Sequence, residues 1–265
     1  MTRLTSEWIS GMEEEMTRYD RSLKKRTGMG LGELAAKAVA LDCEDMKRKL
    51  EEYTAAAIPI TSGQGVIGSF ADSVAAILRT AGAKAFVPGN ADVSGIHEAV
   101  GQKADILFMA DDDRYIALNV KNGRFADNNH STALGYVTAL EAMAGPLRNR
   151  KVLVVGCGVV GRLAAGILKQ KGALVYAFDK DGDKAKEVPA DEILASLSGL
   201  NEFGLIFDAT NEGGWIKPGM LSKDTYIASP GVPLSLDANA LMLHEGTLIH
   251  DLLQIGTAVM LAEVL

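Results

Sequence analysis

The chain has 265 residues with a formal charge of −7 at pH 7, and 48% of its residues are hydrophobic. This length gives room for one large or two modest domains with a proper core. The acidic balance excludes the basic footprint of a nucleic-acid-binding protein, and no apolar run is long enough to cross a membrane, so neither is expected as a partner.

The first element predicted is an amphipathic helix over residues 5–24 that gives way at Gly28. An apolar face this regular is typical of a helix that packs, either on the body of the protein or on a second subunit. Shorter helices are expected over 31–40 and 43–53. The apolar face consists of Trp8, Met12, Met16, Tyr19 and Leu23.

A strand is predicted over 56–60, followed by a small polar loop at 61–65 and a helix over 66–81. A glycine-rich loop at a helix start favours anions. Ser62 in this loop is therefore a candidate contact for a substrate carboxylate or carbonyl. An ordinary strand-to-helix turn explains the pattern equally well.

Further strands are predicted over 85–87, 105–109 and 115–120, with a loop and short helix at 92–102. Asp111, Asp112 and Asp113 lie between the last two of these strands. Because three adjacent carboxylates are costly to bury, most of them must be solvated or paired. Either the segment is a plain hairpin turn, or Asp111 points from the strand end into a cleft.

A polar segment over 125–131 leads into a helix over 131–144, which Gly145 and Pro146 end. Asn128 or Asn129 is suited to cap this helix. We expect the helix to connect two domains, an N-terminal domain over 1–130 and a second domain over 131–265.

Residues 151–179 follow the pattern strand, G-x-G-x-x-G, helix, strand and terminal acid. The whole unit is the fingerprint of a dinucleotide-binding β-α-β fold. Gly156 permits a tight turn, Gly158 lets the backbone approach a pyrophosphate, and Gly161 lets the helix pack close to the strand. The backbone of Val159 and Val160 at the helix start favours phosphate charge.

Asp179 ends the second strand of this unit. Its carboxylate is expected to accept hydrogen bonds from ribose hydroxyls and to repel a 2′-phosphate, which favours NAD over NADP. Lys180 beside it weakens this preference. A fold of this type that binds S-adenosylmethionine, or no nucleotide, is the alternative.

Three later strands end in polar residues, and ligands of an open parallel sheet lie at such carboxyl ends. We expect Thr210, Asn211 and Ser229 near the cofactor, and His250 and Asp251 near the substrate. A histidine at a strand end is more often structural than catalytic. The apolar stretch 252–265 is predicted to be a helix that covers an interdomain face.

The predicted fold class is α/β, with a C-terminal Rossmann-type NAD-binding domain and a smaller N-terminal α/β domain that begins with the amphipathic helix. Cys43 and Cys157 give neither a disulfide framework nor metal-ligand spacing, and hydride transfer needs no metal, so no metal is expected. The acidic N-terminus without a signal-peptide core indicates a cytoplasmic protein.

Several motifs together resemble the PylD family, the dehydrogenases of pyrrolysine biosynthesis. The resemblance covers most of the chain, and the N-terminal segments make it more specific than the glycine fingerprint alone. The motifs are Tyr19-Asp20-Arg21, Thr27-Gly28-Met29, the Ile58–Gly65 loop, Met109–Ala117 with its Asp-Asp-x-Arg-Tyr core, Asp127-Asn128 and Gly156–Gly161.

The resemblance implies that the enzyme oxidises the terminal amine of 3-methylornithyl-lysine with NAD as hydride acceptor, and we expect the protein to be a homodimer. The imine then loses ammonia through a semialdehyde, and the unit's own α-amine closes the ring to pyrrolysine. It also implies that Asp111 stabilises the developing positive charge, with Asn128 orienting it and Ser62 contacting the substrate.

Two other readings stay open. Two-domain dehydrogenases of the shikimate or methylenetetrahydrofolate type share the predicted architecture, but they usually rely on a catalytic lysine. Here Lys84, Lys103 and Lys121 are the lysines between residues 55 and 130, and none lies in a polar loop of catalytic type. The other reading is an NAD-binding protein without activity, against which the polar strand ends argue.

Overall fold

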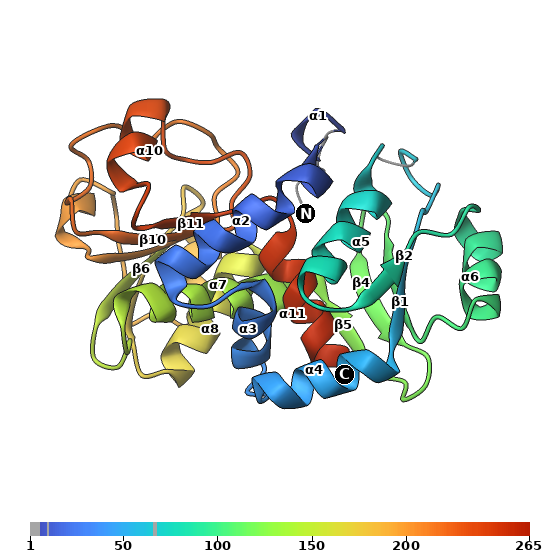
Figure 1. Cartoon of the computed structure of the whole chain (residues 1–265). Helices are drawn as coiled ribbons and strands as arrows, with labels where there is room; N and C mark the ends of the chain where they lie inside the picture. The colour runs from blue at the N-terminus through green and yellow to red at the C-terminus, as the bar shows by residue number, and fades with distance from the viewer. Residues whose placement is uncertain (1–5, 10, 66–67) are drawn as a thin grey trace. The chain divides into compact units, whose positions relative to one another are not determined.

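The computed structural model describes residues 6–9, 11–65 and 68–265, and it divides the chain into two compact units (Figure 1). Among these residues, unit 1 comprises the chain up to Lys25, Met29–Ser131 and Leu252–Leu265, and unit 2 comprises Arg26–Gly28 and Thr132–Asp251. The first residue of the predicted helix 5–24, the side chain of Trp8, and Val66 and Ile67 at the start of the predicted helix 66–81 lie outside the described residues.

Unit 1 is built on a mixed five-stranded sheet in the order β2-β1-β3-β4-β5. β1 pairs in parallel with β2 and β3, whereas β4 runs antiparallel to both of its neighbours. The strands predicted here are confirmed, but the start of the polar segment 125–131 also forms a strand, β5, which was not predicted. The strands are β1 (Thr54–Ile58), β2 (Lys84–Phe86), β3 (Ile106–Ala110), β4 (Tyr115–Asn119) and β5 (Phe125–Asp127).

Helices cover both faces of this sheet. Residues alternate between the faces of a strand, so Ala56 and Ile58 share one face of β1. They pack with Ala99 of α6 in one buried cluster, and α5 contacts β1 and β2. The helices of unit 1 before the C-terminus are α1 (Ser6–Ile9), α2 (Met12–Thr27, whose last two residues fall in unit 2), α3 (Leu31–Ala38), α4 (Cys43–Glu52), α5 (Phe70–Thr80) and α6 (Asp92–Gly101).

The C-terminal helix α11 (Gln254–Val264) belongs to unit 1, whereas the expected domain boundaries grouped it with the dinucleotide-binding domain. It contacts α3, α5, β4 and β5. Every residue of α11 except Glu263 is buried. Because a helix that is apolar on all sides needs neighbours on all sides, α11 forms the centre of unit 1 rather than a cover.

The predicted apolar face of the N-terminal helix is buried at Met12, Met16 and Leu23. We expect deletion of residues 1–24 to give an aggregating or inactive protein, because it removes these side chains and leaves apolar surface uncovered. Light scattering and an activity assay on the truncated chain check this. A truncated protein that is monodisperse and fully active would show that the helix is dispensable.

Unit 2 is built on a six-stranded parallel sheet in the order β11-β10-β9-β6-β7-β8. This is the doubly wound arrangement, in which the chain starts at the centre and adds strands first on one side and then on the other. The strands are β6 (Lys151–Val155), β7 (Leu174–Phe178), β8 (Glu192–Ile193), β9 (Leu205–Asp208), β10 (Tyr226–Ser229) and β11 (Leu248–His250).

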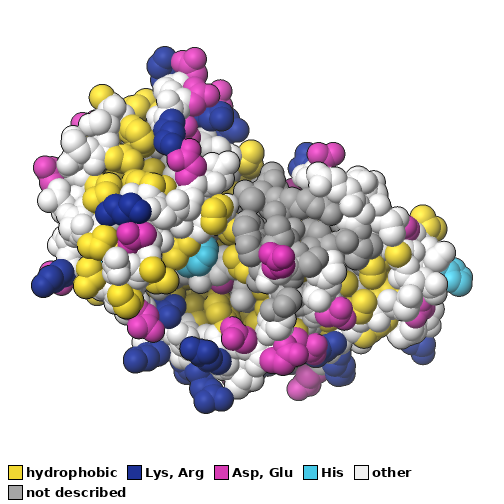
Figure 2. Space-filling view, turned by 90° about the horizontal axis from the view of Figure 1, so that it is seen from above, with side chains coloured by type: hydrophobic (Ala, Val, Ile, Leu, Met, Phe, Trp, Pro, Cys, Tyr) yellow, Lys and Arg dark blue, Asp and Glu magenta, His cyan; other side chains and the backbone are white. Residues whose placement is uncertain are grey.

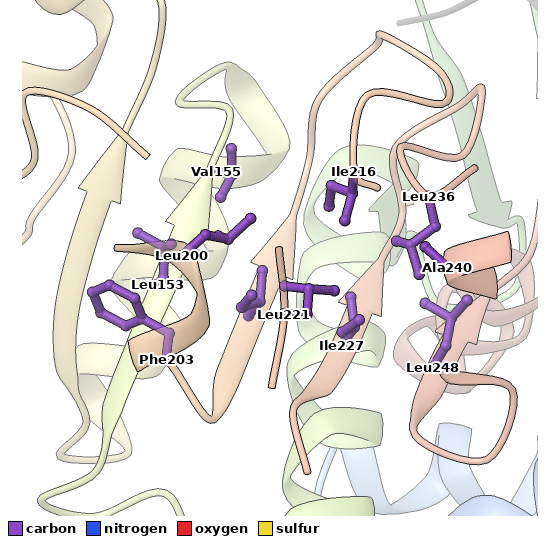
Figure 3. Close-up of a cluster of buried hydrophobic side chains, with 11 residues drawn as sticks. Leu153, Val155, Leu200, Phe203, Ile216, Leu221, Ile227, Leu236, Ala240 and Leu248 are labelled. Atoms are coloured by element: carbon purple, nitrogen blue, oxygen red, sulfur yellow. The ribbon is translucent and has the colours of Figure 1, made fainter. Parts of the chain in front are cut away.

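The two faces of β6 bury different partners. Val154 faces α8, since a side chain added at Gly161 of that helix would contact it. Leu153 and Val155 therefore face the opposite side, where they join a cluster that extends along β9, β10 and β11 to Leu248 (Figure 3). The helices of unit 2 are α8 (Val159–Gln170), α9 (Gly182–Lys186), the short 3-10 turn Leu200–Glu202, α10 (Ala238–His244) and most of α7 (Asn128–Ala144).

On the face drawn in Figure 2, acidic and basic side chains lie beside one another at many of the places where charge is visible. Exposed pairs such as Arg162 with Glu187 and Lys169 with Asp191 show the same mixing. Within the ranges that the structure describes, no helix is both long and apolar enough to cross a bilayer.

Candidate functional site

The three glycines of the fingerprint differ in what the protein itself requires of them. Gly156 has φ +86°, and a Cβ there would lie 2.8 Å from the backbone of Ala209. A Cβ on Gly161 would lie 1.9 Å from the Gly156 carbonyl oxygen. A Cβ on Gly158 would meet no atom within 4 Å in the described part of the chain. The fold thus explains the first and third glycines, while Gly158 leaves open space at the start of α8, which fits a pyrophosphate.

Asp179 holds the glycine turn in place. Its Oδ2 accepts a hydrogen bond of 2.6 Å from the backbone N–H of Cys157, and its Oδ1 accepts one of 2.8 Å from Asp181. Burial, and then the nearby Asp179 carboxylate, raise the pKa of the Cys157 thiol to about 12. The thiol therefore stays protonated at neutral pH and serves as a small packing side chain rather than a nucleophile.

The lysine beside Asp179 has its own partner. Lys180 forms an exposed ion pair with Glu212. Its charge is thus already countered by a carboxylate, which reduces its value as a ligand for a 2′-phosphate.

We expect Asp179→Ala to narrow the preference for NAD over NADP, chiefly by weakening NAD. The change removes both a hydrogen-bond acceptor and a charge that repels a 2′-phosphate, so a shift of about tenfold in the ratio of kcat/KM values is expected. Asp179→Asn is the matched variant, since it keeps one acceptor oxygen for the turn. A wild-type enzyme that used NADP as well as NAD would contradict the role of Asp179.

Two of the predicted cofactor residues, Thr210 and Ser229, contact a carboxylate that was not predicted as a site residue. Asp208 is fully buried at the end of β9. Its Oδ1 accepts hydrogen bonds from the backbone and hydroxyl of Thr210, at 3.1 and 2.7 Å. Its Oδ2 accepts from the hydroxyls of Ser229, at 2.9 Å, and of Ser235. Asp208 thereby connects the loops that follow β9 and β10, while Asn211 is exposed after β9.

His250 is the last residue of β11, and Asp251 follows it. Nδ1 of His250 lies 2.8 Å from the Ser229 carbonyl oxygen, which can only accept, so Nδ1 carries the proton. The tautomer that matches this contact has its lone pair on Nε2. Asp251 is buried, and its backbone N–H and carbonyl both hydrogen-bond to the hydroxyl of Tyr136. Burial raises the pKa of Tyr136 well above its usual value. The hydroxyl therefore stays protonated at neutral pH and holds the backbone of Asp251 through these two hydrogen bonds.

In unit 1, the structure brings Ser62, Asp111 and Asn128 to one edge of the sheet. Ser62 follows β1, Asp111 follows β3, and Asn128 follows β5. β1 and β3 are parallel, and β5 regains their direction because it is antiparallel to β4. The carboxyl ends of β1, β3 and β5 therefore lie along the same edge of the sheet, the one that runs across the strand ends. Ligands of sheets with parallel strands bind outside such carboxyl ends.

Asp111 is exposed and lies in the turn between the antiparallel strands β3 and β4, so the backbone here forms the hairpin turn that was one of the two predicted alternatives. Its Oδ1 accepts hydrogen bonds from the backbone N–H groups of Asp113 and Arg114, at 2.8 and 2.7 Å. These bonds, that of Arg114 first, lower the pKa of the Asp111 carboxyl. Neither of these two bonds uses Oδ2. The Asp111 carboxylate is thus held in place through one oxygen at the carboxyl end of β3.

The next aspartate connects two of the site loops. Oδ2 of Asp112 accepts a hydrogen bond of 2.8 Å from the backbone N–H of Gln64. Gly63 has φ +73°, and a Cβ there would lie 2.2 Å from the same oxygen. Asp92 holds the other end of this loop through the backbone and hydroxyl of Thr61. The loop that carries Ser62 is thus fixed at both ends by carboxylates.

Asn128 begins α7, but another residue caps the helix. Oδ1 of Asp127 accepts from the backbone N–H of Asn129 at 2.9 Å, and Oδ2 pairs with Arg114 at 3.2 Å. The side chain of Asp127, the residue before the two asparagines, thus accepts from the first turn of α7 in the manner of an N-cap. Nearby, Glu263 of α11 accepts from Ser131 and contacts His130.

Asp112 and Asp208 are the positions that the sequence did not single out as site residues. Asp112 is one of three adjacent aspartates, and the sequence pattern does not show which of them contacts another loop. Asp208 carried one signal, since an acidic residue directly after Leu205-Ile206-Phe207 extends a strand of buried type. A carboxylate in that position needs donors from elsewhere in the chain.

Comparison with known proteins gives two family matches. Residues 9–126 match the N-terminal domain of the pyrrolysine biosynthesis protein PylD, and residues 126–201 match the C-terminal domain of alanine dehydrogenase and PNT. The chain is 32% identical to a pyrrolysine synthase of Methanosarcina acetivorans over 100% of both chains. It is 37% identical to the pyrrolysine synthase of Methanosarcina barkeri over 78% of this chain and 80% of that one.

Among solved structures, the chain resembles the 5-ketofructose reductase of a Gluconobacter species in its ligand-free form. The two share 16% sequence identity with a TM-score of 0.51, over 79% of this chain and 90% of that one. At this identity the likeness concerns the fold, an α/β architecture with a Rossmann-type domain.

Proposed function

The chain belongs to the pyrrolysine synthase family, and from this premise we propose that it is an NAD-dependent dehydrogenase that oxidises the terminal amine of 3-methylornithyl-lysine and so forms pyrrolysine. The observation that carries the proposal is similarity along the whole chain, from the N-terminal domain to the glycine fingerprint. The alternatives of a shikimate-type dehydrogenase and of an inactive NAD-binding protein have no comparable support.

NAD would be held in unit 2 by the open position at Gly158, the backbone at the start of α8, and Asp179. NAD supplies the acceptor for the hydride that leaves the carbon bearing the amine. The Asp179 carboxylate, together with the ion pair that occupies Lys180, supports NAD rather than NADP.

Asp111 would hold the reacting amine and stabilise the positive charge that develops as hydride leaves. Its lowered pKa keeps the carboxylate charged at neutral pH, and its turn hydrogen bonds fix the charge before substrate arrives. The same lowered pKa makes Asp111 a poor proton acceptor, because a general base works best with a pKa near the operating pH.

The proton of the substrate ammonium therefore needs another acceptor. We assign this to His250 or to a water that it binds, because its Nδ1 donates to Ser229 and leaves the Nε2 lone pair available. Ser62 and Asn128 would orient the substrate at the edge of the unit 1 sheet that also carries Asp111.

The chemistry balances without a metal. The substrate ammonium loses a proton, the neutral amine so formed loses a hydride from its carbon to give an iminium ion, and NAD becomes NADH. Water adds to the iminium carbon, ammonium leaves, and an aldehyde remains. The α-amine of the same unit attacks the aldehyde and loses water, which closes the pyrroline ring.

The direct test is to incubate the pure protein with NAD and synthetic 3-methylornithyl-lysine. NADH absorbance together with a product of pyrrolysine mass is the expected result. Panels of hydroxy acids and of other amines, run in parallel, separate this function from the shikimate-type alternative. No hydride transfer to NAD from any panel member would contradict the proposal.

The expected homodimer and the cytoplasmic location expected from the N-terminal sequence stay predictions. The dimer is checked by light scattering of the full chain. The location is checked by cell fractionation.

A further inference from the structure

Asp208 lies where the strand order of unit 2 changes direction. The chain continues from β6 to β7 and β8 on one side, and then returns to add β9, β10 and β11 on the other. Asp208, the last residue of β9, is in register with Val155, which precedes the glycine turn. A dinucleotide in this fold crosses the sheet at this point. Asp179 marks the side of the adenosine ribose, so Asp208 lies on the side of the nicotinamide half.

The carboxylate of Asp208 has an unusual set of partners. It is 0% exposed and accepts four hydrogen bonds, all from the neutral groups of Thr210, Ser229 and Ser235. Among the described residues, no lysine, arginine or histidine pairs with it. Both oxygens act as acceptors, as those of an ionised carboxylate do.

We propose that the buried charge of Asp208 makes this protein bind the oxidised cofactor in preference to the reduced one. The nicotinamide ring is positively charged in NAD and neutral in NADH, and the rest of the molecule is the same. A fixed negative charge on the nicotinamide side therefore stabilises the first form selectively. The inference rests on the proposed use of NAD.

Two physical points support an effect of useful size. An interaction between charges is stronger away from bulk water than at an exposed surface, where solvent and salt screen it. The hydroxyl dipoles are already oriented toward the carboxylate, so no reorganisation is needed when the cofactor binds. For an enzyme that consumes NAD, such a preference also limits product inhibition by NADH.

The test measures the affinities of NAD, NADH and ADP-ribose for the wild type and for Asp208→Asn by calorimetry. The asparagine is nearly isosteric and removes the charge. We expect the ratio of NADH to NAD dissociation constants to fall about tenfold, while ADP-ribose, which lacks the nicotinamide, binds as before. Ser235→Ala is the matched control, because it removes one donor and keeps the charge, so its ratio should stay near that of the wild type.

An unchanged ratio in Asp208→Asn would overturn the proposal, and so would an equal weakening of all three ligands, which would show that Asp208 only holds the loops. If Asp208→Asn is unstable, the double variant D208N/S235A is used instead. It also removes the Ser235 hydroxyl, which donates to Oδ2 in the wild type and would face the asparagine NH2 group, a donor, in the single variant. The same ratio of NADH to NAD dissociation constants is then measured. A wild type that binds NADH more tightly than NAD would also overturn it. ADP-ribose binding by the wild type tests the cofactor site itself, so failure of the redox preference and failure of the proposed function are distinguishable.

Discussion

Asp111→Asn is expected to lower kcat on the order of 10²-fold or more while NAD affinity stays at the wild-type value. The asparagine Oδ1 is able to accept the same two backbone N–H groups that Asp111 now holds at 2.8 and 2.7 Å, so the hairpin turn is retained. The variant therefore removes the charge and little else. A group that acts mainly in the transition state lowers turnover more than substrate binding.

The dependence on pH follows from the lowered pKa of Asp111. The charge is fully present above the usual pKa of an aspartate and is lost only as the pH falls through the lowered value. The contribution of Asp111 to kcat should therefore not vary across neutral pH, which the ratio of kcat for the wild type to kcat for Asp111→Asn, measured at several pH values, shows.

Asp113→Asn is the matched control, because Asp113 is an exposed aspartate of the same turn and the same charge is removed. It should retain near wild-type turnover. Asn128→Ala should lose less than Asp111→Asn, since Asn128 orients and carries no charge. If Asp111→Asn turned over the substrate at the wild-type rate, Asp111 would be a solvated turn residue, and Asp251 and His250 would become the candidates for the charged group.

Gly158→Val is expected to abolish measurable NAD binding without unfolding the protein. The backbone at Gly158, with φ −68° and ψ −166°, is accessible to valine, and a Cβ there meets no described atom within 4 Å. The protein itself thus tolerates the side chain, at a cost of about 1 kcal/mol for the poorer N-cap. The branched side chain instead fills the space through which a pyrophosphate must approach the helix start.

Gly166→Val is the matched control, because Gly166 lies in the same helix and a Cβ there also meets no described atom within 4 Å. It should bind NAD as the wild type does. Circular dichroism establishes that both variants are folded, and calorimetry measures NAD affinity. Unchanged affinity in folded Gly158→Val would remove the dinucleotide site from this helix.

Unit 2 shows how far local pattern goes. The strand, glycine turn, helix and terminal acid of residues 151–179 all form as predicted, because each depends on neighbours within a few residues: buried apolar runs, a positive φ at Gly156, and a free helix start. The candidate site of unit 1 was also partly predictable, because polar residues that follow strands of the same direction lie at the same end of the sheet.

The sequence alone thus determined most of the strands of both units, the dinucleotide fingerprint and the candidate residues Ser62, Asp111 and Asn128. Only the tertiary structure decided that α11 crosses back to form the centre of unit 1, that Asp112 fixes the glycine-rich loop, and that hydroxyls from two loops surround Asp208. The reason is physical: periodicity and turn chemistry are local, whereas the partner of a buried helix or a buried carboxylate is set by chain segments far away in sequence.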